Sequence, residues 1–220
     1  MMETEGLINR VAILGAGRVG TSIARTLIDA GYNVTLAGSG DPENVEMIAA
    51  ITAPGAAARW AREATADADL VVLALPLHRL PTVDTAMLAD RLVIDAMNYW
   101  PPVDGTIAAF EDAATGSSVV VREMLQISRL VKTFNHTGYH DLEPDRRPSG
   151  HPERLGMAVA GDSPQDVAVV AELIDRIGYD PVALDRLELG WQLQPGNPLF
   201  GARPTADDIR AVTSPVFDVA

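Results

Sequence analysis

The chain has no cysteine among its 220 residues. Disulfide bonds, thiolate nucleophiles, iron–sulfur clusters and cysteine zinc sites are therefore excluded. Positive charge is also scarce, because Lys132 is the only lysine beside sixteen arginines and the formal net charge is −13. Nucleic acids and anionic membranes bind to basic faces, so we expect neither as a partner.

Long apolar segments are missing too. The longest run, Leu70–Leu77, is far short of the roughly 18 residues that a membrane helix needs. Met1–Arg10 carries Glu3 and Glu5 and has no apolar centre, so it does not read as a signal peptide. We expect a cytoplasmic protein. The preference for arginine over lysine, together with abundant alanine, favours a bacterial source.

Apolar runs alternate with helical patterns, which is typical of βαβ units. We predict strands over Arg10–Leu14, Asn33–Ala37, Leu70–Leu75, Leu92–Asp95, Leu130–Phe134, Leu155–Ala160 and Tyr179–Leu184, and a weak one within Gly55–Trp60. We predict helices over Arg18–Ala30, Pro42–Ile51, Arg62–Ala68, Pro81–Ala89, Ser117–Met124 and Pro164–Ile177, and a short one near Ala206–Val212. The predicted fold class is α/β, a Rossmann-type doubly wound and mostly parallel sheet with a C-terminal α/β extension.

No linker divides the chain. Residues 1–187 are expected to form one Rossmann domain, whose C-terminal α/β extension begins near residue 130. Residues 188–220 are rich in glycine and proline and are expected to form an irregular tail. Residues 135–154 show no periodicity, and loops of that length within a domain are usually functional or mobile.

A glycine motif joins the first strand to the first helix. Its residues fit the pattern G-x-G-x-x-G and are Gly15, Ala16, Gly17, Arg18, Val19 and Gly20. Gly15 permits the turn, Gly17 lets a pyrophosphate approach the backbone, and Gly20 lets the helix pack closely on the strands. The free N–H groups of the helix would hold the phosphates. The motif therefore predicts a dinucleotide site, and a turn made for packing alone is the alternative.

The end of the second strand bears on the choice of dinucleotide. NAD enzymes usually carry an acidic residue there, but this strand is followed by Gly38-Ser39-Gly40-Asp41. Ser39 can hydrogen-bond a 2′-phosphate, whereas Asp41 would repel one unless it turns away as a helix cap. We therefore favour NADP over NAD, with Arg18 or Arg59 as the source of the missing positive charge.

Two further strand ends carry candidate ligands, since open α/β sheets bind ligands at the carboxyl ends of their strands. Leu75, Pro76 and Leu77 are placed to line the nicotinamide pocket, and His78 is interpreted as a rim residue. Asn98 is placed to bond the nicotinamide amide or ribose. Tyr99 and Trp100 either form the wall of a flat ligand or anchor their loop.

The sixth strand ends in a polar stretch, Asn135-His136-Thr137-Gly138-Tyr139-His140-Asp141. We interpret it as the lining of a second ligand site. Structural histidines are one alternative. A metal held by His136, His140 and Asp141 is another, but no fourth ligand is evident, so we predict no metal.

Taken together, these segments resemble a known family. Gly15–Gly20, Gly38-Ser39, Leu73–Pro76, Asp95–Asn98 and Lys132–Thr137 are similar in order and spacing to the NADPH-dependent reductases of the deazaflavin coenzyme F420. The resemblance implies a homodimer that binds NADP along Gly15–Val19, Ser39, Leu75–Leu77 and Asn98. It also implies that F420, or a flavin, stacks on the nicotinamide near Pro76, Asn135, His136 and Thr137 and exchanges a hydride with it.

Two other functions stay open at this stage. One is an NADP-dependent dehydrogenase of a small carbonyl or imine, which generally needs a proton donor; His136 is the candidate. The other is a sensor that binds the dinucleotide without turnover.

Overall fold

The computed structural model describes residues 8–111 and 115–214, and it is built on one eight-stranded sheet. The strand order is β3-β2-β1-β4-β5-β6-β7-β8. Strands β1 to β6 are parallel, β7 is antiparallel to β6, and β8 is parallel to β7. The predicted fold class, a mostly parallel Rossmann-type sheet with a C-terminal α/β extension, is confirmed.

The strands are short, as expected of a parallel sheet covered on both faces. Their bounds are β1 Arg10–Leu14, β2 Asn33–Ala37, β3 Ala57–Ala58, β4 Leu70–Leu73, β5 Leu92–Asp95, β6 Leu130–Lys132, β7 Gly156–Gly161 and β8 Asp180–Leu184. Each of the eight predicted strands is present, and most differ from prediction by a few residues at the ends.

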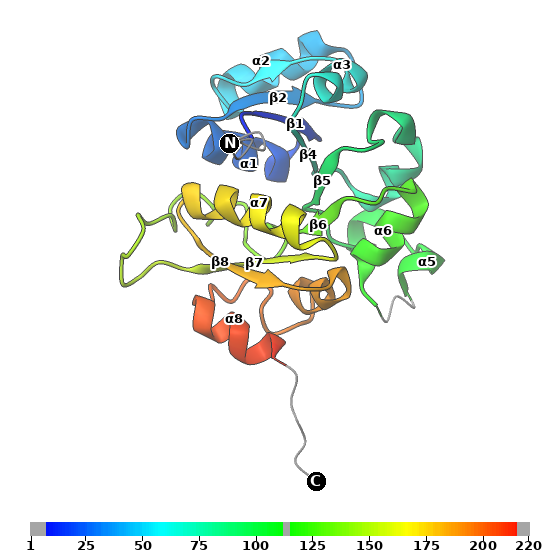
Figure 1. Ribbon diagram of the computed structural model, residues 1–220. Helices are drawn as coiled ribbons and strands as arrows, with labels where there is room; N and C mark the ends of the chain where they lie inside the picture. Colours follow the sequence, from blue (N-terminus) through cyan, green and yellow to red (C-terminus); the bar gives the residue numbers. More distant parts are fainter. Residues whose placement is uncertain (1–7, 112–114, 215–220) are drawn as a thin grey trace, which may run out of the picture.

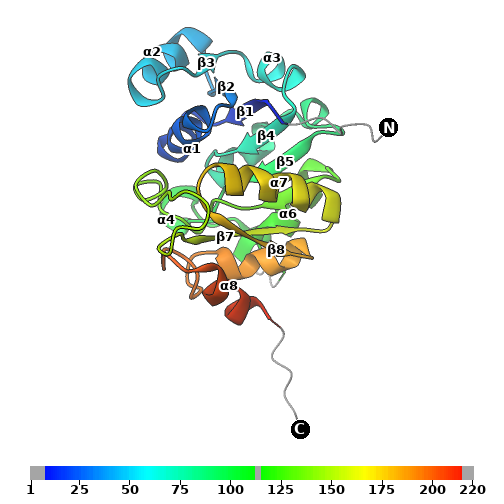
Figure 2. The ribbon, with the colours of Figure 1, turned by 60° about the vertical axis from the view of Figure 1, so that its left-hand side comes forward.

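Helices connect the strands and cover the sheet (Figure 1). The α-helices are α1 Arg18–Asp29, α2 Pro42–Thr52, α3 Ala61–Ala66, α4 Pro101–Asp104, α5 Ala108–Glu111, α6 Ser117–Leu125, α7 Pro164–Arg176 and α8 Ala206–Thr213. Three 3₁₀-helices are η1 Leu77–Thr82, η2 Thr85–Met87 and η3 Leu187–Leu193. Helices α2 and α3 lie at one end of the molecule and α8 at the other (Figures 1 and 2).

Several helix ends follow directly from the sequence. Asp41 accepts a hydrogen bond from the Glu43 N–H and caps α2, and the Ser163 hydroxyl does the same for α7 through Asp166. Gly31 follows α1 with φ +88°, the left-handed conformation that commonly ends a helix at glycine.

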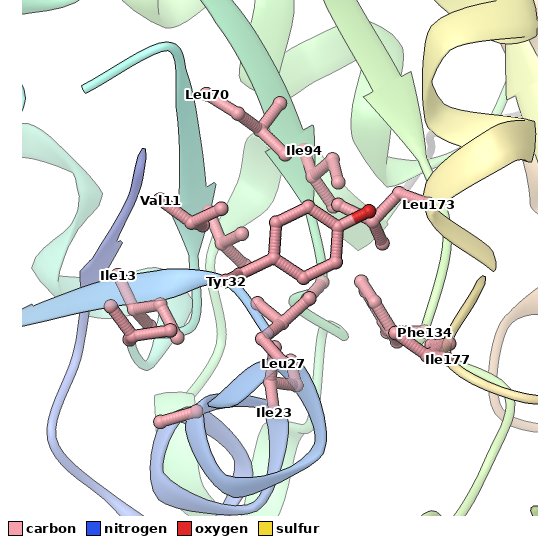
Figure 3. Packing of buried hydrophobic residues seen from close by; sticks show 14 of the residues in the cluster. Val11, Ile13, Ile23, Leu27, Tyr32, Leu70, Ile94, Phe134, Leu173 and Ile177 are labelled. Carbon is pink, nitrogen blue, oxygen red and sulfur yellow. The ribbon is translucent and has the colours of Figure 1, made fainter. Parts of the chain in front are cut away.

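Alternation along the strands divides the core between the two faces of the sheet. Val11 and Ile13 of β1 face α1, α2 and α7, whereas Ala12 and Leu14 face α3, η1 and α6. The ring of Tyr32 lies in the middle of the first cluster, among side chains of α1, the strands and α7 (Figure 3).

One local prediction is wrong. The helix expected over Pro81–Ala89 is a pair of 3₁₀ turns, because Pro81 lacks the N–H that an α-helix needs and Asp84 caps a new turn. In α1, Val19 is 38% exposed, although it continues the apolar pattern of the buried Ile23 and Leu27.

Two helices lie in the part of the tail that the structure describes, which ends at residue 214. The short helix expected near Ala206–Val212 is confirmed as α8, and η3 precedes it. Both pack on β7 and β8, with Leu193, Leu199 and Ile209 forming a third cluster on that part of the sheet. Residues 188–214 therefore cover the C-terminal extension.

This packing is testable at Ile209, whose side chain is fully buried between α8 and the strands. We expect Ile209→Ala to lower the free energy of unfolding by about 2–5 kcal/mol, the usual loss for a buried residue of this size. Val212→Ala, on the half-exposed side of the same helix, should change it by less than about 0.5 kcal/mol. Urea unfolding followed by circular dichroism measures both. Equal effects would show that α8 is not docked.

Candidate dinucleotide-binding and active site

The candidate residues gather at one edge of the sheet. The ends of the parallel strands β1, β2, β4, β5 and β6 are followed by the glycine motif, Ser39, Pro76, Asn98 and Asn135. Because these strands are parallel and adjacent, their carboxyl ends lie side by side, and the order reverses between β1 and β4. A crevice at this reversal is the usual ligand site of such sheets.

Two glycines of the motif are required by close contacts within the chain. A Cβ on Gly20 would lie 1.8 Å from the Gly15 carbonyl oxygen, and one on Gly15 would lie 2.2 Å from the Ala74 oxygen. Gly15 also has φ +127° and donates its N–H to the Ala37 oxygen at 2.8 Å. These contacts tie α1, β2 and β4 together at the turn.

Gly17 differs from both, because the fold itself does not require it. A Cβ there would meet no atom within 4 Å, and its backbone is extended with φ −84°. Gly17 is the N-cap of α1, no side chain caps this helix end, and its first turn carries no acidic residue. The open space and free N–H groups fit a pyrophosphate. Val19, whose side chain is exposed here, borders the same space.

The end of β2 carries the residues expected to meet a 2′-phosphate. Ser39 is exposed, and the Asp41 side chain accepts a hydrogen bond from the Glu43 N–H at 2.9 Å. The carboxylate is thus engaged as a helix cap, the condition under which Asp41 would not repel a phosphate. Arg59, which follows β3, is exposed close to this strand end.

The turns after β4 and β5 are held together by one carboxylate. Asp104 accepts hydrogen bonds from the backbone N–H of His78 at 3.2 Å and of Trp100 at 2.9 Å, and its Oδ1 lies 3.1 Å from His78 Nδ1. His78 is therefore exposed and held by Asp104, and its place at the rim of a pocket stays a prediction. Asp104 is a structural residue that the sequence pattern did not single out. Pro76 is exposed, whereas the Leu77 side chain is buried in the core, so only its backbone is available to a ligand.

Asn98 and Asn135 form a reciprocal pair between the ends of β5 and β6. The Asn98 amide donates to the Asn135 backbone oxygen at 2.8 Å, and the Asn135 amide donates to Asn98 Oδ1 at 3.0 Å. Asn135 also donates to the Leu193 oxygen at 2.8 Å, which fastens the tail to this edge. Asn98 is half-buried, and it keeps one amide N–H for a ligand.

A buried ion pair lies directly beneath this pair. Lys132, the only lysine, donates to Asp95 Oδ2 at 3.2 Å and also to the Met97 oxygen, and both charged side chains are fully buried. Asp95 accepts in addition from the Ser118 hydroxyl at 2.7 Å and the Met97 N–H at 2.9 Å. Burial lowers the pKa of Lys132, and Asp95 opposes that shift. The network fixes the turn that presents Asn98.

His136 is placed differently from the prediction. Its ring is 1% exposed, and its Nε2 accepts a hydrogen bond from the Ala158 N–H at 3.3 Å. Burial, together with the Lys132 charge, lowers the pKa of His136 to about 4. The ring is therefore neutral at pH 7. An inward, neutral histidine fits a structural role, and the expected contact of its side chain with an acceptor stays a prediction. The neighbouring Thr137 is half-buried.

The backbone at this point is strained. Phe134, next to the candidate residues, has φ +66° although it is a buried phenylalanine. This conformation ends β6 earlier than the predicted Leu130–Phe134. Such outliers cluster at functional sites, because only a tightly packed surrounding holds them.

The loop after β6 folds back on the first helix, beside which it lies in Figures 1 and 2. The Ser22 hydroxyl donates to the Tyr139 backbone oxygen at 2.9 Å, and the Arg18 guanidinium donates to the Tyr139 phenol oxygen at 3.2 Å. His140 stacks on Tyr139 with ring centroids 3.9 Å apart. Tyr139 thus borders the glycine motif, a role that sequence spacing alone could not assign.

The remaining candidates from the sequence are the aromatic pair Tyr99 and Trp100 and the alternative of a metal site. The Tyr99 ring stacks on Phe110, and its hydroxyl accepts from the Ile107 N–H, so it anchors its loop. Trp100 is 46% exposed and stays a candidate ligand wall. Within residues 8–111 and 115–214, no group of three or more His, Asp or Glu side chains is arranged to hold a metal. Among the helices described in the structure, none has both the length and the apolar character of a membrane span.

The sheet order and the turn at Gly15 and Gly20 define a Rossmann-type fold with the glycine turn typical of dinucleotide-binding proteins. Residues 10–99 match the family described as "NADP oxidoreductase coenzyme F420-dependent". This match lies within the first half of the chain and agrees with the resemblance stated from the sequence.

Solved structures extend the likeness beyond this segment. The protein SMa0349 of Sinorhizobium meliloti is 25% identical, with a TM-score of 0.74 over 88% of this chain and 94% of that one. A candidate F420-dependent NADP reductase of an Arthrobacter species is 24% identical, with a TM-score of 0.66 over 80% of this chain and 84% of that one; it supports the fold. The YjhV protein of Escherichia coli is 37% identical over 59 residues, 27% of this chain and 43% of that protein.

The two kinds of glycine give a prediction. Gly17→Val should abolish dinucleotide binding, because the side chain fills the space for the pyrophosphate, yet leave the melting temperature nearly unchanged. Gly20→Val should lower the melting temperature steeply, because its Cβ overlaps the Gly15 oxygen. Fluorescence titration with NADPH and thermal unfolding separate the two effects. Unchanged NADPH affinity in Gly17→Val would remove the assignment of the site.

The buried histidine gives a second prediction. Between pH 6.5 and about 4, the unfolded chain binds a proton at His136 that the folded protein does not. Wild-type stability should therefore fall as the pH drops through this window, by up to about 3 kcal/mol from this group. His136→Gln keeps an acceptor for the Ala158 N–H but does not titrate. Denaturant unfolding at several pH values should show a shallower loss for the variant, and identical slopes would contradict the placement of His136.

Proposed function

We propose that the protein is an NADP-dependent oxidoreductase that transfers a hydride between NADP(H) and a deazaflavin of the F420 type or a flavin. The observation that carries the proposal is the glycine turn within the family-matched segment, where Gly17 leaves space that the fold does not need. The sheet order supports the same conclusion, since the glycine turn lies where the strand order reverses, the position at which open α/β sheets bind ligands.

Each part of the edge has a binding role in this proposal. Gly15, Gly17 and the first N–H groups of α1 bind the pyrophosphate, with Ala16, Arg18 and Val19 around it. Ser39 meets the adenosine ribose. Leu75, Pro76 and the Leu77 backbone flank the nicotinamide, and Asn98 donates its remaining amide N–H to the carboxamide or ribose.

The acceptor is proposed to lie beside Asn135 and Thr137, on the nicotinamide side of Pro76. The Gly201 N–H donates to the His136 backbone oxygen at 2.8 Å, which brings the tail with its part-exposed Phe200 to the same place. Trp100 is a second exposed aromatic near the Asn98 turn. These flat side chains suit a ring ligand, whereas the His136 ring supports the loop from inside.

Chemistry of this kind needs little from acidic or basic side chains. NADP(H) supplies or accepts the hydride at nicotinamide C4, and the deazaflavin does so at C5. The residues at this edge would position the two rings for direct transfer and exclude water from between them. The ion pair of Asp95 and Lys132 contributes by fixing the turn that orients Asn98.

A dehydrogenase of small carbonyls or imines is less well supported. Such reactions generally need a proton donor near the hydride acceptor. His136 is neutral and inward, and Lys132 is fully buried against Asp95, so neither is available. No particular contact favours a sensor that binds without turnover. We further propose that the protein is cytoplasmic and acts as a homodimer, as the family resemblance implies.

A paired experiment tests the proposed function. NADPH and NADH are titrated by fluorescence, and turnover is then followed for each with oxidised F420, with FMN and without an acceptor. We expect NADPH to bind more tightly and to reduce F420 rapidly. Tight NADPH binding with turnover of FMN alone would assign a flavin acceptor. Binding without turnover of either would contradict the proposed reaction and favour the sensor.

A second experiment tests the acceptor site with the variant Thr137→Val. Its matched control is Ser214→Ala. Thr137→Val should raise the KM for the acceptor while leaving the affinity for NADPH within about twofold. Ser214, at the end of α8, lies outside the candidate site, so its variant should leave both quantities unchanged. A loss of NADPH binding in Thr137→Val would place this residue in the dinucleotide half.

A further inference from the structure

Arg59 is held beside the end of β2 by the sheet itself. In the ladder of β2 and β3, Thr35 lies opposite Ala57 and Leu36 opposite Ala58. The Arg59 N–H then donates to the Leu36 oxygen at 3.1 Å, so the pairing continues by one residue. Arg59 therefore lies next to Ala37, two residues before Ser39. Neighbouring strands are only about 4.8 Å apart, within the span of an arginine side chain.

The direction of the side chain also suits a ligand at this edge. Ala56 and Ala58 pack into the cluster formed with α1 and α2. Side chains alternate along a strand, so Arg59 points to the opposite face, the one that Ala37 shares. Arg59 is exposed, and so is Trp60, which follows it and is the N-cap of α3.

Two arginines close to this strand end, Arg18 and Arg62, are already engaged, whereas Arg59 is not. Arg79 also lacks a side-chain partner among the described residues, but it follows β4, two strands away from β2. Arg62 pairs with Asp84, and the Arg18 guanidinium donates to the Tyr139 hydroxyl. Across residues 8–111 and 115–214, the Arg59 guanidinium makes no hydrogen bond or ion pair with another side chain or with the backbone. The Arg59 guanidinium is thus a cation without a protein partner, held next to the end of β2. Its position indicates that an anionic group of a ligand pairs with it.

The anions near Ser39 do not compete for this cation. The Asp41 carboxylate is turned to its own helix, where it accepts the Glu43 N–H. The N-terminus of α2 begins at Pro42, directly after Ser39-Gly40-Asp41, and adds a positive dipole end to the same place. No arginine or lysine follows Ser39 in the next nineteen residues, so Arg59 is the first cation after it in the chain.

We propose that Arg59 binds the 2′-phosphate of NADP(H), together with the Ser39 hydroxyl, and so makes the site select NADP over NAD. The inference rests on the proposed function, because it places the adenosine ribose at the end of β2. A guanidinium is suited to this role, since its planar fork donates two parallel hydrogen bonds to one phosphate. NAD lacks that phosphate, so Arg59 should contribute little to its binding.

The test compares NADPH and NADH affinities, by fluorescence titration at fixed ionic strength, for the wild type, Arg59→Ala and Arg59→Lys. Arg62→Ala is the matched control, three residues along the chain and paired with Asp84. We expect Arg59→Ala to weaken NADPH binding about tenfold or more and to leave NADH binding within about twofold. Arg59→Lys should recover part of the loss, and Arg62→Ala should retain the wild-type ratio.

Three results would overturn the inference in different ways. If the wild type selects NADPH and Arg59→Ala selects it equally, another group binds the 2′-phosphate and the proposed NADP dependence stands. If the wild type does not prefer NADPH, the cofactor choice of the proposed function is wrong as well. An equal loss of NADPH and NADH affinity in Arg59→Ala would show that Arg59 supports the loop instead. Thermal unfolding confirms that each variant is folded.

Discussion

Two close backbone contacts at the turn between β1 and α1 determine how the surrounding elements are arranged. Gly20 packs its Cα against the Gly15 carbonyl, and Gly15 packs against that of Ala74, at distances that no other residue permits. These contacts hold the start of α1 close to β1 and β4, so that its free N–H groups lie at the carboxyl edge of the sheet. The candidate anion site and the adjoining strand ends lie at the same edge.

The second organising feature is the change of direction after β6. Five parallel strands bring their polar ends to one edge, and the long loop 135–154 then returns the chain so that β7 runs the opposite way. Arg25 pairs with Glu143 and Tyr139 contacts Arg18, so the loop is fastened to the first helix. On the other side, the Asn135 amide donates to the Leu193 oxygen and so fastens η3 to this edge of the sheet. The candidate acceptor region is thus assembled from segments far apart in the sequence.

Local patterns predicted the sheet and the glycine turn, because each depends on neighbours in the chain. Asp41 caps α2, the role that the sequence left open for it. Side-chain direction was harder to predict. Val19 continues an apolar helical pattern yet is 38% exposed, and His136 stands in a polar stretch yet turns inward to the Ala158 N–H. Both depend on contacts across the sheet, which spacing does not contain.

The most direct measurement is a crystal structure of the protein with NADP⁺. The account predicts the pyrophosphate over Gly17 at the start of α1 and the nicotinamide beside Pro76 and Asn98. The 2′-phosphate should lie between Ser39 and Arg59. Two results would contradict the assignment of this edge as the active site. One is a dinucleotide bound elsewhere, and the other is a lack of dinucleotide density at Gly17 in crystals saturated with NADP⁺.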